Sequence, residues 1–213
     1  MIKPIEKEFQ GNFGRYTITL EDQYEVRKYR IALLICGISF VFGLSQWLLI
    51  SPSLSYIWLF IMAISLGLAL KWIHIYITLL HRMLQLFWAI GLIGLILLSM
   101  IIGPQQMLTE IAIKPIFLFA IGPLFASLAG LGFKEFFCFQ RIEAIGLTLI
   151  LPIALISHLL SILSPAFVMG LLYFSAVLLL IMAIRKFGME AASDIGDKSV
   201  FEYLKNQRLK TNN

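Results

Sequence analysis

The chain has 213 residues, of which 60% are hydrophobic and only 14% charged, whereas soluble domains carry about 45–50% and about 25%. The apolar residues are concentrated in nearly uncharged blocks of about 17–20 residues, a length that crosses the hydrocarbon core of a bilayer. The net charge of +5 does not indicate nucleic-acid binding, because the basic residues flank these blocks and form no basic domain with interleaved aromatics. The composition predicts an all-α, polytopic membrane protein embedded in a lipid bilayer.

Residues 1–30 are predicted to form a polar N-terminal segment. The stretch 15–20 alternates weakly between polar and apolar residues, which is typical of a short extended segment. The sequence Thr19-Leu-Glu-Asp22 fits a capping box, so a helix is expected to begin at Glu21 and lead into the membrane. Because polar residues precede the first apolar block, no cleavable signal peptide is expected.

Six apolar blocks follow and define a predicted transmembrane domain over residues 31–184. They are residues 31–50, 54–70, 86–102, 115–131, 145–163 and 167–184. Tight turns at Ser51-Pro52 and Ser164-Pro165 join the first block to the second and the fifth to the sixth. Residues 71–85 are expected to continue a helix along the membrane surface, and residues 103–114 to form a polar link.

The chain is predicted to end in a polar tail, residues 185–213. An even number of spans places both tails on one side of the membrane. With this assignment, every one of the 17 Lys and Arg residues except Lys114 lies on the side of the tails. Since basic loops remain on the cytoplasmic side, both chain ends are predicted to be cytoplasmic or to face the equivalent compartment of a plastid.

Gly122, Ala126 and Gly130 recur at every fourth position of the fourth block. Such a ridge lets the backbone of a neighbouring helix approach closely, so it is a candidate helix-packing face. The alternative is that glycine and alanine are simply common in membrane helices. Pro115 and Pro123 are expected to begin and to kink this helix.

His158 and Gln46 are a candidate polar site within the membrane. Ionisable residues at such depth usually face the interior of the helix bundle, where they often serve a function. The alternative is a neutral imidazole that is hydrogen-bonded to a neighbouring helix, for example through Gln46. Either reading places both side chains inside the bundle.

His74 and His81 are seven residues apart, which on one helix would place them on one face about two turns apart. Together with His158 they could hold haem or a pigment. The alternative is that His74 and His81 contact lipid headgroups beside Lys71 and Arg82. A spacing of seven is too long to chelate one metal ion, so neither a metal nor a cofactor is expected.

The link that follows the fourth block mixes charged and aromatic residues over 133–143. Its charges and its cysteine form a candidate docking patch for a partner on the cytoplasmic side: Lys134, Glu135, Cys138, Arg141 and Glu143. The alternative is an interfacial helix without a function, because aromatic side chains prefer the membrane surface and charges reach headgroups.

Three stretches carry a resemblance to a known family. They are Gly11-Asn-Phe-Gly-Arg-Tyr-Thr-Ile-Thr19, Tyr24-Glu-Val-Arg-Lys-Tyr-Arg30 and Gly132-Phe-Lys-Glu-Phe-Phe-Cys-Phe-Gln-Arg-Ile-Glu143. In them the chain resembles an uncharacterised integral membrane protein family of cyanobacteria and plastid-bearing lineages, domain of unknown function 2301. That family has no established activity, so the resemblance implies a setting, the plasma or thylakoid membrane of an oxygenic phototroph.

The sequence contains no catalytic triad pattern, phosphate-binding loop or HExxH motif, and none of its 12 acidic residues falls within a predicted span. Proton-coupled carriers commonly place Asp or Glu there. We therefore expect a non-enzymatic protein that binds other membrane proteins, or that helps to assemble or maintain their complexes. The alternatives are a small-solute transporter or channel, with His158 and Gln46 in its path, and a haem- or pigment-binding protein.

Overall fold

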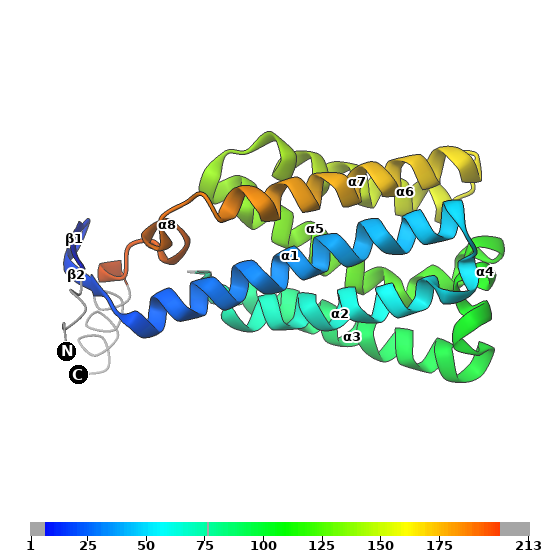
Figure 1. The fold of residues 1–213 in the computed structure, drawn as a ribbon, viewed down its shortest axis with the longest axis horizontal. Helices are drawn as coiled ribbons and strands as arrows, with labels where there is room; N and C mark the ends of the chain where they lie inside the picture. Colours follow the sequence, from blue (N-terminus) through cyan, green and yellow to red (C-terminus); the bar gives the residue numbers. More distant parts are fainter. Residues whose placement is uncertain (1–6, 76, 201–213) are drawn as a thin grey trace.

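A computed structural model describes residues 7–75 and 77–200 (Figure 1). Two strands are followed by eight α-helices and two short 3₁₀ turns. In chain order these are β1 (Lys7–Gly11), β2 (Gly14–Ile18), α1 (Leu20–Leu49), η1 (Pro52–Leu54), α2 (Ser55–Trp72), α3 (Thr78–Ile102), α4 (Pro104–Ile113), η2 (Pro115–Phe117), α5 (Leu118–Phe139), α6 (Ile142–Leu159), α7 (Pro165–Lys186) and α8 (Ala191–Ile195).

Six of the described helices, α1, α2, α3, α5, α6 and α7, are long and apolar enough to cross a membrane. Their outer surfaces carry large apolar side chains such as Phe119, Leu149 and Ile153, which suits a surface solvated by lipid rather than water. The fold class is therefore confirmed as an all-α polytopic membrane protein. At 30 residues, α1 is roughly 45 Å long, so its N-terminal turns extend beyond the bundle (Figure 1).

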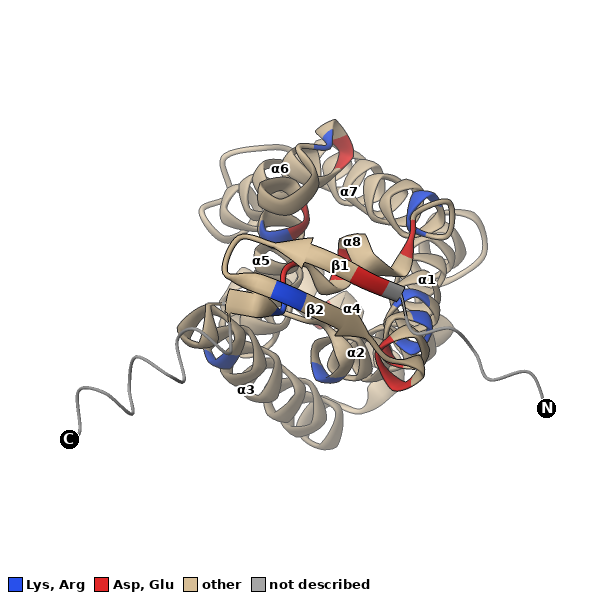
Figure 2. Ribbon diagram, turned by 90° about the vertical axis from the view of Figure 1, so that its left-hand side faces the viewer, with Lys and Arg blue, Asp and Glu red and all other residues tan. Residues whose placement is uncertain are grey.

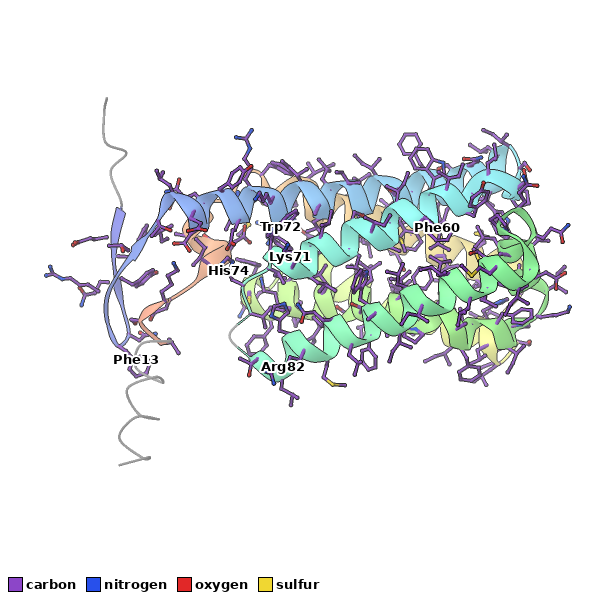
Figure 3. All side chains as sticks on the ribbon, turned by 90° about the horizontal axis from the view of Figure 1, so that it is seen from below. Phe13, Phe60, Lys71, Trp72, His74 and Arg82 are labelled. Atoms are coloured by element: carbon purple, nitrogen blue, oxygen red, sulfur yellow. The ribbon has the colours of Figure 1, made fainter. Side chains whose placement is uncertain are left out.

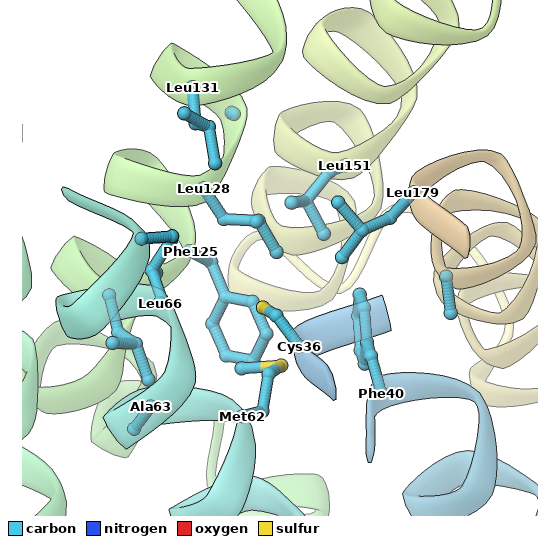
Figure 4. Packing of buried hydrophobic residues seen from close by; sticks show 14 of the residues in the cluster. Cys36, Phe40, Met62, Ala63, Leu66, Phe125, Leu128, Leu131, Leu151 and Leu179 are labelled. Carbon is cyan, nitrogen blue, oxygen red and sulfur yellow. The ribbon is translucent and has the colours of Figure 1, made fainter. Parts of the chain in front are cut away.

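The most buried helix is α5, with half of its most apolar window inside the protein, against 17% for α3. One hydrophobic core joins the helices from α1 to α7; Cys36, Met62 and Phe125 lie close together in it (Figure 4). Phe125 also packs on Phe40 of α1, with ring centroids 5.8 Å apart. The fully buried Cys36 therefore behaves as a small apolar residue of this core.

Helix starts follow the local sequence closely. The Thr19 hydroxyl accepts a hydrogen bond from the Asp22 N–H at 3.2 Å, and the Asp22 carboxylate accepts one from the Thr19 N–H at 2.8 Å. This is the predicted capping box. Ser51 and Ser164 cap η1 and α7 with their hydroxyls, and each is followed by a proline. The two predicted tight turns are thus confirmed.

Three links differ from their predictions. The polar link after α3 folds into α4, which buries Met107 and Ile111 against the end of the bundle. The expected helix over 71–85 is interrupted between Ile73 and Ile77, where α2 has ended and α3 has not begun. The helix of the fourth block continues to Phe139, eight residues past the predicted end. Apolar periodicity is weak at the membrane surface, so it does not locate these boundaries.

The first and last described segments of the chain pack together at one end of the bundle. Strands β1 and β2 form an antiparallel hairpin with Lys7 opposite Ile18, and Ile18, Val26 and Ile195 form a small second core. Figure 2, seen from this end, shows the hairpin and α8 surrounded by Lys, Arg, Asp and Glu residues. We call β1, β2, the first turns of α1 and residues 187–200 the terminal module.

The residues just after β1 and at the end of the described chain hold each other. The Asn12 N–H donates to Asp197 Oδ2 at 2.7 Å, and the Phe13 N–H donates to Ser199 Oγ at 3.1 Å. Lys198 pairs with Asp22. A two-stranded hairpin is at best marginally stable alone, so these contacts help to fix it. The hydrogen bonds from the Ser199 hydroxyl and the Asn12 N–H lower the pKa of Asp197.

Candidate functional site

A buried cluster of charges joins the bundle to the terminal module. We define this ionic cluster by Tyr29, Arg30, Lys134, Glu135, Lys186 and Asp194. Glu135 accepts a hydrogen bond from the Tyr29 hydroxyl at 2.7 Å and contacts Lys186 Nζ at 2.5 Å and Lys134 Nζ at 3.1 Å. Lys186 Nζ also lies 2.5 Å from Asp194 Oδ1. One lysine of α7 therefore links an acid of α5 to an acid of α8.

Arg30 makes the second connection to α8. Its Nε donates to Asp194 Oδ2 at 2.7 Å, and its two terminal nitrogens donate to the carbonyls of Met189 at 2.8 Å and Glu190 at 3.1 Å. The planar guanidinium can satisfy several acceptors at once in this way. The predicted domain boundaries at residues 30 and 185 fall within α1 and α7, two of the four helices that carry the cluster.

The cluster changes how the candidate docking patch is interpreted. Lys134 and Glu135 are only 5% and 2% exposed, so they lie inside the protein and not on a surface that a partner can touch. Glu143 is buried as well, and it pairs with Arg185 at 2.9 Å and with Arg141 at 3.6 Å. Of the five residues, Cys138 remains exposed. The sequence missed this because neighbouring helices, not the local pattern, decide which face of a helix end is covered.

His74 lies at the same end of the bundle, in the break between α2 and α3. Figure 3 shows it beside Lys71 and Trp72, close to the terminal module. Its Nε2 is 3.5 Å from the Glu25 carboxylate of α1. Burial of the ring lowers the pKa of His74, although the charges of Glu25 and Asp22 act in the opposite direction.

The structure does not bring His158 and Gln46 together by a hydrogen bond. His158 lies in the last turn of α6, and its Nε2 is 3.0 Å from the carbonyl oxygen of Ile111 in α4. Gln46 instead accepts a hydrogen bond from the indole N–H of Trp58 at 2.7 Å. The suggested pair is therefore wrong, because α4, which the sequence showed only as a polar link, supplies the partner of His158.

His158 lines a half-open cavity of about 370 Å³ in the half of the bundle away from the terminal module. The cavity lies between α1, α2, α4, α5, α6 and α7, and Phe40, Trp47, Trp58, Phe125 and Leu155 form much of its wall. No Asp, Glu, Lys or Arg is among its lining residues. A space of this size with an apolar wall and a few polar groups is typical of a ligand site.

The small residues of the predicted packing face, Gly122, Ala126 and Gly130, lie in two different surroundings. At Gly130 an added Cβ would lie 2.4 Å from Leu84 of α3, so this position is a true close contact. At Gly122 nothing lies within 4 Å of such an atom, and Gly122 and Ala126 line a groove of about 320 Å³ on the bundle surface. The closest approach of α3 to α5 is made by Gly91 and Gly94 of α3.

The three histidines lie in separate surroundings. A break in the helix separates His74 from His81, so they do not share one helix face as expected. The Nε2 of His81 is 2.7 Å from the carbonyl oxygen of Leu70. Over residues 7–75 and 77–200, no three His, Cys, Asp or Glu side chains are grouped so that they could hold a metal ion.

Comparison with known proteins agrees with the membrane architecture. A family model described as "Uncharacterized integral membrane protein (DUF2301)" matches residues 68–203, almost two thirds of the chain. The matched region runs from the end of α2 through α8, so it includes Lys134, Glu135, Lys186 and Asp194. No curated protein and no solved structure matches the chain. The chain belongs to the DUF2301 family of integral membrane proteins.

Proposed function

We propose that the protein is a non-enzymatic, partner-binding membrane protein that helps to assemble or maintain membrane complexes through its terminal module. One observation carries this proposal. The first and last described segments of the chain contact each other and are fixed to the bundle by Arg30, Lys186 and Asp194, whose side chains are almost fully buried. Such anchoring holds a small polar surface rigidly at the membrane, as a docking platform requires.

The platform surface is the hairpin rather than the 133–143 link. Arg15 and Thr17 of β2 are exposed, and a two-stranded sheet leaves backbone groups at its outer edges to which an extended segment of a partner can add. We place this module in the cytoplasm, because the basic residues gather at this end. The membrane is proposed to be the plasma or thylakoid membrane of a phototroph.

The transporter alternative has less support from the geometry. A path for a small polar solute needs polar groups along its length, but the cavity beside His158 is lined mostly by apolar side chains, and the core cluster between it and the ionic cluster is made mainly of Leu, Met, Ala and Phe. For pigment or haem binding, the nearest candidate is His158, whose Nε2 already faces the Ile111 carbonyl.

Site-specific crosslinking in native membranes tests the platform. A photoreactive amino acid replaces Thr17 in β2, and the matched control replaces Gln106, which is exposed on α4 at the opposite end. We expect a discrete adduct from position 17 and none of that mass from position 106. In Asp197→Ala, which loses the bond to the Asn12 N–H, the yield of this adduct should fall. Equal adducts from both positions, or only unresolved bulk protein, would contradict the proposal.

A further inference from the structure

The cavity beside His158 and the groove that contains Gly122 are neighbours. Three side chains line both of them: Leu118 and Phe125 of α5, and Leu155 of α6. The groove opens on the outer face of α5 and α6, where Phe119 and Ile156 are exposed among the apolar residues that face lipid. These three side chains therefore form the wall between the cavity and a groove that faces the hydrocarbon of the bilayer.

Both helices carry a proline at this wall. Pro123 of α5 and Pro152 of α6 line the groove, and each lies inside its helix. A proline removes one backbone hydrogen bond and disturbs the turn before it. The helices are thus locally weakened where they flank Leu118, Phe125 and Leu155. Movement of these side chains would connect the cavity to the groove and so to lipid.

The lining determines what the cavity accepts. Its polar contribution is small and no lining residue is charged, so a long hydrocarbon chain fits it and a polar solute does not. Lys114, the basic residue of this end within the described chain, pairs with Glu110 at 2.8 Å. A phosphate group placed here would therefore lack a free cation, which favours a neutral lipid over a phospholipid.

His158 defines the polar end of such a ligand. A carbonyl oxygen only accepts, so Nε2 must carry the proton in the contact with Ile111. In the neutral ring this leaves Nδ1 as a hydrogen-bond acceptor, and His158 is one of the residues that line the cavity. Trp47 and Trp58 line the same cavity, and indole rings are typical of the membrane interface. A hydroxyl group at the interface can donate to Nδ1 while its chain extends into the bundle.

We propose that this cavity binds one neutral, single-chain lipid with a terminal hydroxyl, which reaches it from the bilayer through the wall of Leu118, Phe125 and Leu155. The hydroxyl is held at His158 and the hydrocarbon chain fills the space between Phe40, Phe125 and Leu155. This binding is independent of the terminal module, which lies at the other end of the bundle.

The test uses the full chain in phosphatidylcholine nanodiscs with a long-chain fatty alcohol that carries a diazirine in its chain. Labelled peptides are mapped by mass spectrometry. We expect labelling of cavity residues, and its loss in Met169→Trp, which fills the cavity from α7. Ile181→Trp, a change on the same helix outside the cavity lining, should keep the labelling. Labels spread over the outer surface, or unchanged in Met169→Trp, would overturn the proposal.

A second pair of variants tests the route. Gly122→Phe places a ring in the outer groove, because Gly122 lines it and an added Cβ there meets nothing within 4 Å. Gly170→Phe makes the same change at a glycine of α7 whose added Cβ also meets nothing within 4 Å. We expect Gly122→Phe to slow the appearance of the label and to leave its final level unchanged, with no effect of Gly170→Phe. Equal rates in both variants would overturn access through this wall.

A third arm identifies the headgroup. The same diazirine chain is supplied on phosphatidylcholine instead of the alcohol. If only the alcohol labels the cavity, the ligand is neutral, as proposed. If both probes label it equally, the proposed neutral ligand is overturned, because the cavity then takes up bulk phospholipid. His158→Leu should remove the preference for the alcohol over a diazirine-bearing alkane of equal length. If the preference survives, His158 does not hold the hydroxyl.

Discussion

Gly94 of α3 lies against the backbone of Ala120 in α5, so closely that an added Cβ would be 2.0 Å from the Ala120 carbonyl oxygen. One turn earlier, Gly91 meets the backbone of Leu124 in the same way, at 2.2 Å from its nitrogen. Together with the hydrogen bond from the Ser127 hydroxyl to the Leu84 carbonyl, these two close contacts hold α3 against α5. This is the small-residue packing typical of membrane helices: the small residues belong to α3, and they contact the backbone of α5.

Gly94→Ala should therefore destabilise the protein. The methyl group has to displace backbone rather than a flexible side chain, and such overpacking costs about 1–3 kcal/mol. Gly122→Ala is the control, because its methyl group meets nothing within 4 Å. The unfolding temperatures of both variants are measured in detergent, with size-exclusion chromatography to detect the protein that remains folded after heating. Equal unfolding temperatures for the two variants would contradict the assigned packing face.

Lys186→Met should be strongly destabilising, because it leaves Glu135 and Asp194 without this shared cation. Breaking a buried ion pair typically costs about 3–5 kcal/mol. The neighbouring Arg185→Met removes an arginine whose side chain is 55% exposed and leaves its buried partner Glu143 with Arg141, so a smaller loss of stability is expected, because solvent weakens pairs with an exposed member. Chemical denaturation should give clearly different free energies of unfolding for the two variants. A small loss of stability in Lys186→Met would mean that the cluster does not anchor α8.

His158→Leu should loosen α4. The carbonyl of Ile111 would lose its donor, and leaving such a group unsatisfied costs about 1–3 kcal/mol. Hydrogen exchange of the backbone amides measures the effect. Relative to wild type, we expect exchange to become faster in α4 and to stay unchanged in α2. His158→Gln, which keeps an N–H donor, should restore part of the protection. Unchanged exchange in both variants would show that the contact is not formed.

His74 should make stability depend on pH. Its folded pKa is lowered by burial, so the contribution of the neutral ring is fully present above the unfolded value of about 6.5 and is lost as the pH falls through the folded pKa. Wild type should therefore lose more thermal stability between about pH 7 and pH 5 than His74→Gln. A variant that loses as much as wild type would assign the pH dependence to other groups.

Cys138 reports the orientation of the protein without any substitution. It is exposed near the C-terminal end of α5, while Cys36 is buried in the core. If the terminal module is cytoplasmic, a membrane-impermeant maleimide should label Cys138 in inverted vesicles and not in intact cells. Gln106→Cys, at the opposite end, should show the reverse pattern in a Cys138→Ser background. Labelling of Cys138 in intact cells would invert the proposed topology.

Much of the secondary structure could be predicted because its causes are local. Thr19 and Asp22 cap α1 through atoms three residues apart, and Ser164 before Pro165 specifies the start of α7. The third family motif, residues 132–143, lies within the region that the family model matches. The hairpin was predicted only in its second strand; the turn that follows β1 is held by hydrogen bonds from Asn12 and Phe13 to residues about 185 positions later, which local sequence does not reveal.

The sequence by itself determined that the chain crosses a bilayer, because about 20 apolar residues can satisfy their backbone in lipid only as a helix. It also determined where most helices begin. Only the tertiary structure decided that Lys134 and Glu135 are buried, that His158 bonds to Ile111, and that Gly122 faces a groove while Gly94 touches α5. The reason is that the sequence of a helix does not show which of its faces is covered, because the helices that cover it come from distant parts of the chain.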